Sequence, residues 1–410
     1  MSADQHVVII GAGHAGGSAA AALRQGGWEG RITIVGDEPE LPYQRPPLSK
    51  GWLKGEETAE SLALRSAKFY GENEIEVRVS ARAETIDRDG RRVSLSDGAE
   101  LAYDYLILAT GSRNRPLPVA GADLGGVLEL RSAAHADALQ AALQPGKRLA
   151  VVGGGFIGLE VAASARKLGV DVTVIEREPR LLSRVVCPEV SAFFTKRHEE
   201  EGVELLLDVS VSGFTGSEGN ITAVALADGR EIACDMALVG IGAIPNQELA
   251  AEAGLECTNG ITVDDEARTS DPHIFAIGDC ANRPMPFYDE RMRLESVPNA
   301  LEQAKQAAWA ICGKPKPAPE VPWFWSDQFD MRLQIAGLPF GSAQRVLRGS
   351  QEDGKFAVYH LAADDRVLCV EAVTFPQAMA IGKILIGKRA IVPAERLGDE
   401  SVPLKELARG

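Results

Sequence analysis

Cysteine is scarce in this sequence and unevenly placed, which excludes a large group of redox and metal proteins. The 410 residues contain six cysteines, and no two of them are closer than 23 residues in the sequence. The chain therefore has no Cys-x-x-Cys pair of the kind that holds a metal or performs thiol–disulfide exchange. Residues 1–186 contain no cysteine at all. We expect six reduced thiols and no metal site.

Long apolar runs and targeting signals are missing as well. No stretch reaches the roughly 18 uninterrupted apolar residues that a transmembrane helix requires. The small apolar residues at 11–23 have no basic segment before them, unlike the core of a signal peptide. These absences predict a cytoplasmic protein without membrane insertion.

Positive charge is in deficit. The sequence has 43 Lys and Arg residues against 58 Asp and Glu residues, a net charge of −15. Such a chain repels a phosphate backbone and an anionic membrane, so we expect no nucleic-acid partner. The hydrophobic share of 45% and the charged share of 25% are ordinary for a soluble globular protein. The length predicts two or three domains.

A nucleotide-binding motif begins at Gly11. An apolar strand pattern over 7–10 leads into Gly11-x-Gly13-x-x-Gly16, followed by an alanine-rich helix and a second strand at 32–35. In such a unit the first glycine permits the tight turn, the second lets the backbone approach a pyrophosphate, and the third packs helix on strand. The alternative is a glycine-rich turn without a ligand, but the complete unit favours a dinucleotide site.

The same plan recurs later in the chain. Gly153-x-Gly155-x-x-Gly158 again stands between an apolar strand and a helix, with another strand after the helix. The similarity continues downstream, where residues 97–111 align with residues 228–242. Two copies of one supersecondary plan predict two dinucleotide sites.

The two copies differ at the end of the second strand of each unit. Glu176 stands there in the second copy, at the distance where a carboxylate accepts the ribose hydroxyls and repels a 2′-phosphate. In the first copy the strand ends at Gly36, with Asp37 just beyond, so its ribose assignment is less secure. For either acid the alternative is a solvated residue at a strand end.

Four segments resemble a known family. They are Pro42–Lys50 (PYQRPPLSK), Ala109–Gly111 (ATG), Ile277–Asp279 (IGD) and Trp323–Gln328 (WFWSDQ). Together they are similar to the bacterial NADH-dependent ferredoxin reductases, which include the putidaredoxin reductase type and the reductase components of biphenyl-type dioxygenases. The resemblance covers nearly the whole chain, and RPPLSK at 45–50 together with WSDQ at 325–328 is far more specific than either glycine motif.

The resemblance implies an α/β, glutathione-reductase-like fold with two Rossmann-type dinucleotide-binding domains and a C-terminal α+β domain. Residues 1–112 and 244–320 would form a discontinuous FAD-binding domain, and residues 113–243 the NAD-binding domain. Residues 321–410 would form the C-terminal interface domain. The proline-rich stretch at 315–322 is typical of a linker.

Carried over residue by residue, the resemblance also implies the cofactor contacts. The residues expected to bind FAD and NAD are Gly11, Gly13, Ala15, Gly16, Asp37, Arg45, Lys50, Ala83, Thr110, Gly111, Arg131, Gly153, Gly155, Ile157, Gly158, Glu160, Glu176, Gly242, Asp279 and Val297.

Some of these residues have a more specific implied role. Asp37 would meet the adenosine ribose, and Asp279 the ribityl chain. Val297 would meet the pyrimidine end of the flavin through its backbone, where a helix from about Asn299 offers N–H groups and a positive dipole end. For Arg131 a surface position without a ligand is an equally good interpretation.

The resemblance places the hydride chemistry on Lys50 and Glu160, with Trp325 against the flavin ring. Lys50 would supply positive charge beside flavin N5, and Glu160 would hold the nicotinamide carboxamide and balance the lysine. The backbone at 240–242 would complete the nicotinamide pocket. The alternatives are an exposed salt bridge for Lys50 and Glu160, and core packing for Trp325 and its aromatic neighbours.

The missing cysteines decide where the electrons go. Disulfide reductases of this fold carry a redox cysteine pair, which residues 1–186 cannot supply. We therefore expect NADH to reduce FAD, and the flavin to pass electrons singly to a [2Fe–2S] ferredoxin that serves a P450 or an aromatic-ring dioxygenase. The alternatives are a rubredoxin reductase, a monodehydroascorbate reductase, or an apoptosis-inducing-factor-like redox binding protein. The last needs a basic surface, which this chain lacks.

The ferredoxin is expected to dock on the C-terminal segment. Residues 321–410 carry as many acidic as basic residues, Arg409 included, so the first 320 residues carry the whole negative charge. An acidic ferredoxin is repelled least near Lys383, Lys388 and Arg389. We expect a monomer or a weak homodimer.

Overall fold

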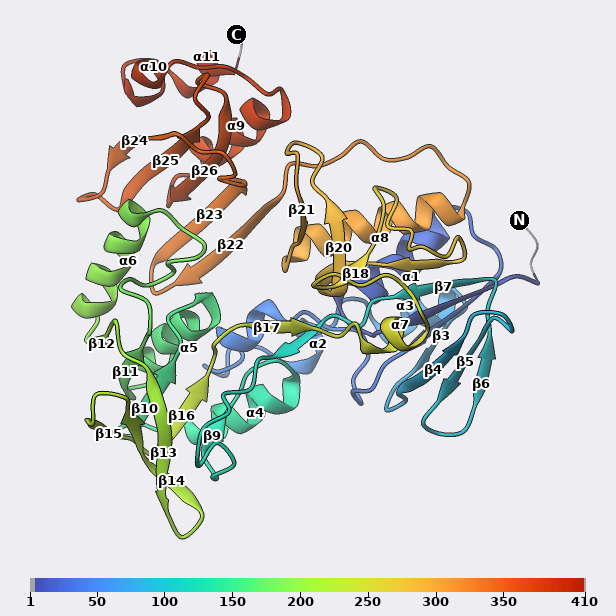
Figure 1. Ribbon diagram of the computed structural model, residues 1–410, viewed down its shortest axis with the longest axis horizontal. Helices are drawn as coiled ribbons and strands as arrows, with labels where there is room; N and C mark the ends of the chain where they lie inside the picture. Colours follow the sequence, from blue (N-terminus) through green and yellow to red (C-terminus); the bar gives the residue numbers. More distant parts are fainter. Residues whose placement is uncertain (1–3, 409–410) are drawn as a thin grey trace. The chain divides into compact units, whose positions relative to one another are not determined.

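The computed structural model describes residues 4–408, which fold into two compact units (Figure 1). Unit 1 contains the chain up to Gln44, Ala59–Arg113 and Ile244–Pro322, and unit 2 contains Arg45–Thr58, Asn114–Ala243 and the chain from Trp323 onward. The predicted division into three domains remains a prediction. Arg409, which was counted in the charge balance, lies outside the described residues.

Unit 1 is built on a parallel sheet of five strands in the order β19-β7-β1-β2-β3. Its central strand is buried along its whole length, as the continuous apolar run at 7–10 predicts for a strand covered on both faces. In chain order the strands are β1 (His6–Ile10), β2 (Arg31–Val35), β3 (Ile75–Arg78), β7 (Tyr105–Leu108) and β19 (Ile274–Ala276).

Two helices cover one face of this sheet and lie side by side, α1 (His14–Gln25) and α8 (Val297–Ile311) (Figure 1). Alanines fill their contact, because small side chains let helix axes approach closely. The other face packs on a three-stranded meander. The meander consists of β4 (Ala83–Asp87), β5 (Arg92–Leu95) and β6 (Glu100–Ala102). The remaining elements of unit 1 are β18 (Ile261–Thr262), β20 (Ala281–Pro284), β21 (Arg291–Arg293), α2 (Ala59–Leu62), α3 (Ala67–Glu72), α7 (Glu248–Glu252) and the 3-10 turn η2 (Gly278–Cys280).

Unit 2 repeats this plan with a second parallel sheet in the order β12-β11-β10-β16-β9. A meander covers one face through Phe214 and Val224, and α5 packs against Val151 on β10. These elements are β9 (Val127–Leu128), β10 (Arg148–Val152), β11 (Asp171–Ile175), β12 (Glu204–Leu206), β13 (Val211–Ser217), β14 (Asn220–Leu226), β15 (Glu231–Ala233), β16 (Met236–Val239), α4 (Ala133–Ala142), α5 (Phe156–Lys167) and α6 (Pro188–Glu200).

The duplication extends to the hydrogen bonds of the glycine-rich turns. The N–H of Gly11 donates to Val35 at 2.8 Å, and the N–H of Gly153 donates to Ile175 at 2.9 Å. Each turn therefore closes against the strand that follows its own helix. The predicted duplication of a βαβ unit with a meander and a closing strand is confirmed. The short strands β8 (Ser112–Asn114) and β17 (Ala243–Pro245) contain two of the points where the chain passes between the units.

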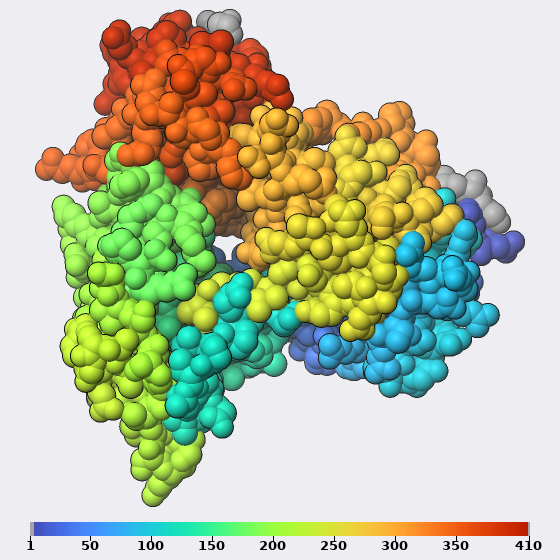
Figure 2. Space-filling view, viewed as in Figure 1, coloured from blue at the N-terminus to red at the C-terminus, as the bar shows by residue number. Residues whose placement is uncertain are grey.

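The C-terminal part of unit 2 is an antiparallel sheet in the order β22-β23-β26-β25-β24, as the α+β expectation requires. Residues 314–322 before it contain no helix or strand. Figure 2 shows α6 (green) against this sheet (orange and red). The elements are β22 (Trp323–Gln328), β23 (Met331–Gly337), β24 (Gln344–Ser350), β25 (Lys355–Leu361), β26 (Val367–Val373), α9 (Pro376–Gly387), α10 (Ala394–Gly398), α11 (Leu404–Leu407) and, from the start of unit 2, the 3-10 turn η1 (Pro46–Ser49).

The start of α8 differs slightly from its prediction. The helix begins at Val297 rather than near Asn299. Pro298 stands in its first turn, where a missing N–H costs nothing, and the Ser296 hydroxyl accepts from the N–H of Asn299. Separately, none of the helices within residues 4–408 is both long enough and apolar enough to span a bilayer.

We predict that Gly382→Ala destabilises unit 2. The added Cβ would lie 2.2 Å from Cγ1 of Val370, so α9 must move away from β26. Overpacking of this kind costs about 1–3 kcal/mol. Urea denaturation, which gives the free energy of unfolding, measures this loss of stability. The matched control is Gly71→Ala in α3, where a Cβ meets nothing within 4 Å and the helix propensity rises. Equal stability of both variants would contradict the prediction.

Candidate functional site

The first glycine-rich turn lies at the carboxyl end of the parallel sheet in unit 1. Gly11 has φ +116°, and a Cβ on it would lie 2.1 Å from the carbonyl oxygen of Ala109. A Cβ on Gly16 would lie 1.9 Å from the carbonyl oxygen of Gly11. These two glycines are required because backbone packs directly on backbone here.

Gly13 has a different environment. A Cβ on Gly13 would meet no protein atom within 4 Å. Gly13 is also the N-cap of α1 and has no side chain with which to cap the first turn. An open space in front of an uncapped helix N-terminus fits a pyrophosphate. The first turn therefore has the cradle that a bound dinucleotide needs.

Other predicted residues of unit 1 follow the ends of neighbouring strands. Thr110 and Gly111 follow β7, and Asp279 follows β19 and accepts from the Ser112 hydroxyl at 3.2 Å. Ala15 also lies at this edge, because a Cβ built on Gly278, the residue before Asp279, would be 2.9 Å from the Cβ of Ala15. Parallel sheets of this kind bind their ligands at such an edge.

The remaining predicted residues of unit 1 stand at element ends. Asp37 is exposed beyond β2, Ala83 opens β4, and Val297 opens α8. The predicted cofactor residues that belong to unit 1 are Gly11, Gly13, Ala15, Gly16, Asp37, Ala83, Thr110, Gly111, Asp279 and Val297.

The second glycine-rich turn, in unit 2, repeats the same division of labour. Cβ atoms on Gly153 and Gly158 would lie 2.5 Å and 2.3 Å from backbone oxygens, whereas a Cβ on Gly155 would meet nothing within 4 Å. Gly155 is the N-cap of α5, again without a side-chain cap. Ile157 in the first turn of α5 is 46% exposed, although it is a large apolar side chain. This turn also fits a pyrophosphate.

Backbone N–H groups hold Glu176 beside the second turn. Its Oε2 accepts from the N–H of Gly154 at 2.6 Å, and its Oε1 accepts from the N–H of Glu178 at 2.9 Å. The carboxylate is thus fixed at the end of β11, where a ribose would lie. Gly242, with φ +115°, follows β16.

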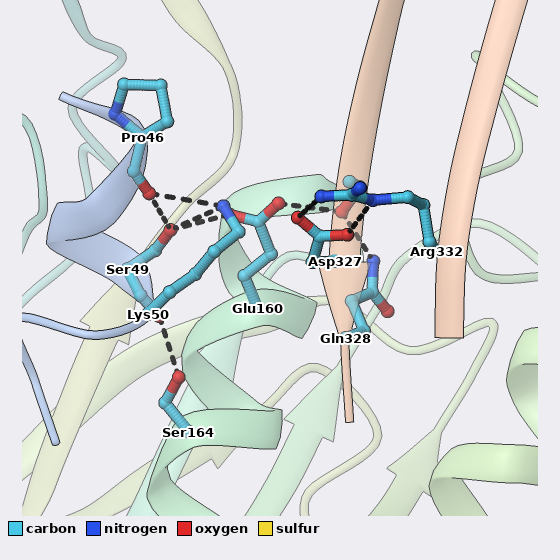
Figure 3. Close-up of polar contacts among 9 residues, drawn as sticks. Pro46, Ser49, Lys50, Glu160, Ser164, Asp327, Gln328 and Arg332 are labelled. Carbon is cyan, nitrogen blue, oxygen red and sulfur yellow. Dashed lines mark hydrogen bonds and ion pairs between the residues drawn. The ribbon is translucent and has the colours of Figure 1, made fainter. Parts of the chain in front are cut away.

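Lys50 and Glu160 meet in unit 2 (Figure 3). The Lys50 ammonium donates to Glu160 Oε2 at 2.6 Å. The Glu160 carboxylate is only 4% exposed and Lys50 is 22% exposed, so the alternative of an exposed salt bridge does not apply. The Ser49 hydroxyl donates to the same oxygen at 2.5 Å, and the Ser164 hydroxyl donates to the Ser49 carbonyl at 2.8 Å.

A row of hydrogen-bonded side chains on α6 and β22 leads to the other oxygen of the Glu160 carboxylate. The Ser326 hydroxyl donates to Glu160 Oε1 at 2.7 Å, and the Gln328 amide donates to the Ser326 oxygen at 3.1 Å. Gln328 Oε1 lies 2.8 Å from Nε2 of His198. Burial lowers the pKa of His198 to about 4. These three residues were not predicted as site residues. Ser326 and Gln328 belong to the WFWSDQ motif, but His198 had no signal in the sequence.

Three further predicted residues lie in unit 2. The Arg45 guanidinium donates to the carbonyl of Arg131 at 2.5 Å, so the two arginines are joined. Trp325 is half-buried on β22, with its ring 5.5 Å from that of Trp323. The predicted residues of unit 2 are Arg45, Lys50, Arg131, Gly153, Gly155, Ile157, Gly158, Glu160, Glu176, Gly242 and Trp325. Their roles toward a cofactor remain predictions.

The cysteines within the described chain are all free thiols. Cys187 is buried beside His360 and Glu371, and their potential ligand atoms lie within 4.8 Å of one another. Burial, with the nearby Glu371 carboxylate, raises the pKa of Cys187, which makes it an unreactive thiol. His360 Nε2 lies 2.8 Å from Glu371 Oε1, so hydrogen bonding within the cluster accounts for it. The expectation of no metal remains a prediction.

Two uncapped glycine-rich turns on two parallel sheets define a class, the dinucleotide-binding oxidoreductases. The chain belongs to the pyridine nucleotide-disulphide oxidoreductase family, whose model matches residues 5–304, and a model described as "Reductase C-terminal" matches residues 323–408.

Full-length relatives share this organisation. The chain is 50% identical to "Probable ferredoxin reductase CtmF" of Castellaniella defragrans over 100% of both chains. It is 45% identical to "Putidaredoxin reductase CamA" of Pseudomonas putida over 99% of this chain and 97% of the relative. The reductase in a crystal structure of the covalent putidaredoxin reductase–putidaredoxin complex superposes with a TM-score of 0.97 at 44% identity, covering 100% of this chain and 99% of that one. The predicted family and fold are confirmed.

We predict that His198 makes the protein less stable in mild acid. Its folded-state pKa of about 4 lies below the usual 6.5, so the unfolded chain takes up a proton that the folded protein does not. The stability is present above pH 6.5 and is lost as the pH falls toward 4. Between pH 7.5 and 5.5 the loss from this residue is about 1 kcal/mol.

Urea unfolding at the two pH values measures this loss. His198→Gln can still donate to Gln328 but does not titrate, so its stability should fall less than that of the unaltered protein. Parallel losses in both proteins would show that His198 does not cause the effect.

Proposed function

We propose that this protein is an FAD-containing NADH:ferredoxin oxidoreductase. It takes hydride from NADH and passes electrons one at a time to a [2Fe–2S] ferredoxin that serves a P450 or an aromatic-ring dioxygenase. The observation that carries the proposal is the pair of open, uncapped helix N-termini at Gly13 and Gly155, in a chain without a cysteine before Cys187. The names of the full-length relatives support it. We also propose a cytoplasmic location.

The first turn belongs to the resident cofactor. Gly13 and the first N–H groups of α1 bind the pyrophosphate of FAD, Asp37 the adenosine ribose, and Asp279 the ribityl chain. The start of α8 at Val297 directs its N–H groups and dipole toward the pyrimidine end. FAD, when bound, supplies a group that accepts a hydride and releases single electrons.

The second turn belongs to the visiting cofactor. Gly155 and the N-terminus of α5 bind the NADH pyrophosphate. Glu176, whose two oxygens already accept backbone N–H groups, is fixed where it can accept ribose hydroxyls. A 2′-phosphate at that position would meet this fixed negative charge.

Lys50 and Glu160 orient the reacting partners. Glu160 accepts from the nicotinamide carboxamide, and Lys50 neutralises the buried carboxylate while bringing positive charge to the place where hydride is accepted. Ser49 fixes the carboxylate from the same side as Lys50. The electrons then leave to a separate protein, because a buried Cys187 with a raised pKa is a poor redox thiol.

Acceptor selectivity tests the proposed function. With NADH, the protein should reduce a putidaredoxin-type [2Fe–2S] ferredoxin at saturable rates and rubredoxin far more slowly. Ferricyanide serves as the control that reports flavin turnover alone. Fast ferricyanide turnover without ferredoxin reduction, or a preference for rubredoxin or monodehydroascorbate, would overturn the assignment.

Valine in place of Gly13 or Gly155 should prevent the binding of FAD or of NADH, respectively. A Cβ at Gly13 meets no protein atom within 4 Å, so Gly13→Val should fill the space for the FAD pyrophosphate and give a folded protein that largely lacks FAD. Gly155→Val should retain FAD and lose NADH binding. The flavin absorbance per protein and the rate of flavin reduction by NADH measure the two effects. Full flavin in Gly13→Val would refute the assignment of the first turn.

Glu176 should select NADH over NADPH. An unfavourable charge contact and lost hydroxyl hydrogen bonds amount to about 2–4 kcal/mol of discrimination. The kcat/KM for NADH divided by that for NADPH measures this discrimination, and Glu176→Gln should lower the ratio. Neighbouring Arg177, 68% exposed, is available to weaken the selection. An equal kcat/KM for NADH and NADPH would eliminate Glu176 as the selector.

A further inference from the structure

A continuous row of buried hydrogen bonds connects α6 to the carboxylate of Glu160. The row begins at His198 on α6, continues through Gln328 and Ser326 on β22, and ends at Glu160 on α5. All four side chains are buried. Burying a polar side chain destabilises the folded protein unless the side chain is hydrogen-bonded. Each of these four side chains is therefore held in the orientation that its hydrogen bonds require.

The direction of the row follows from the chemistry of its members. The Gln328 amide nitrogen, a donor only, donates to the Ser326 oxygen, so the Gln328 carbonyl oxygen must accept from His198 Nε2. Having accepted one hydrogen bond, the Ser326 hydroxyl directs its own hydrogen to Glu160 Oε1. All hydrogens in the row point toward the carboxylate.

The state of His198 agrees with this direction. Burial lowers the pKa of His198 to about 4, so the ring is neutral near pH 7 and carries one proton. Its Nδ1 has no hydrogen-bond partner among residues 4–408. The proton therefore resides on Nε2, where the row requires a donor. The His198 ring packs in a T-shaped arrangement with the ring of Phe329, which follows Gln328 in the chain.

The two oxygens of Glu160 are held by different kinds of donor. Oε2 is held by the buried Ser49 hydroxyl and by the partly exposed Lys50 ammonium. Oε1 is held by Ser326, which is fully buried in a paired strand. Ser49 holds Oε2 independently of these residues, whereas Oε1 is positioned by Ser326 and the hydrogen bonds behind it.

We propose that Ser326, Gln328 and His198 are positioning residues that orient Glu160 to accept the nicotinamide carboxamide. They act through Glu160 and do not touch the nucleotide themselves. The inference rests on the proposed function, since it assumes that Glu160 meets the nicotinamide.

Equilibrium binding to the FAD-loaded protein tests the proposal without turnover. Isothermal titration gives the Kd of NAD⁺ and of ADP-ribose, which lacks the nicotinamide. Ser326→Ala should weaken NAD⁺ binding about fivefold to tenfold, as expected for a misplaced charge-assisted hydrogen bond. The Kd of ADP-ribose should stay within twofold. Equal weakening of both ligands, or of neither, would overturn the proposal.

A double-mutant cycle shows whether Ser326 acts through Glu160. In the Glu160→Gln background, Ser326→Ala should change the Kd of NAD⁺ by less than twofold. The matched control is Ser191→Ala, because Ser191 is a buried serine of α6 that donates to Leu181 and takes no part in the row. It should leave both ligands unaffected in both backgrounds. The same factor for Ser326→Ala in both backgrounds would overturn the proposal.

A second variant guards against misfolding of Ser326→Ala. Ser326→Cys keeps nearly the size of the side chain and buries no new charge, but replaces the hydroxyl that donates to Glu160 with a thiol, a much weaker donor. It should also weaken NAD⁺ selectively over ADP-ribose, and an unchanged Kd would count against the row.

The outcome is separable from that of the proposed function. A protein that passes this test and fails to reduce ferredoxin would refute only the acceptor. A protein that binds neither NAD⁺ nor ADP-ribose would refute both proposals.

Discussion

The packing around α5 in unit 2 depends on the buried carboxylate of Glu160. Burying an unpaired ion costs several kcal/mol, so the charge persists only if donors surround it. Those donors come from separate parts of the sequence, Ser49 and Lys50 on one side and Ser326 on the other. One charged group thus explains why the 45–58 segment and the first strand of the antiparallel sheet must both pack on α5.

The identical glycine motifs contain two different physical roles. Gly11, Gly16, Gly153 and Gly158 have no side chain because a Cβ there would lie only 1.9–2.5 Å from a backbone oxygen. Gly13 and Gly155 are small although the protein places nothing there. The first role belongs to folding, and the second fits the proposed pyrophosphates, so a motif that looks uniform in the sequence has a packing part and an open part in the structure.

Much of the fold was predictable from the sequence because its signals are local. Buried apolar strands, the spacing of the glycines and the repeat at 97–111 and 228–242 depend on neighbours in the chain. The approach of Lys50 to Glu160 followed only from the family resemblance. The contact between His198 and Gln328 joins residues 130 apart, and a lone histidine in a charged helix carries no sign of its partner. The early start of α8 was missed because Pro298 interrupts the helical pattern while being harmless in a first turn.

The helix α6 is attached to the antiparallel sheet at both of its ends. At its start, the N–H of Cys187 donates to both oxygens of Glu371 at 3.0 Å, which places a carboxylate at the positive end of the helix. At its far end, His198 meets Gln328, and Arg197 pairs with Asp330 at 3.1 Å. Because α6 also contacts β12 of the parallel sheet, we expect the two layers to open together and to exchange their amide hydrogens as one cooperative unit.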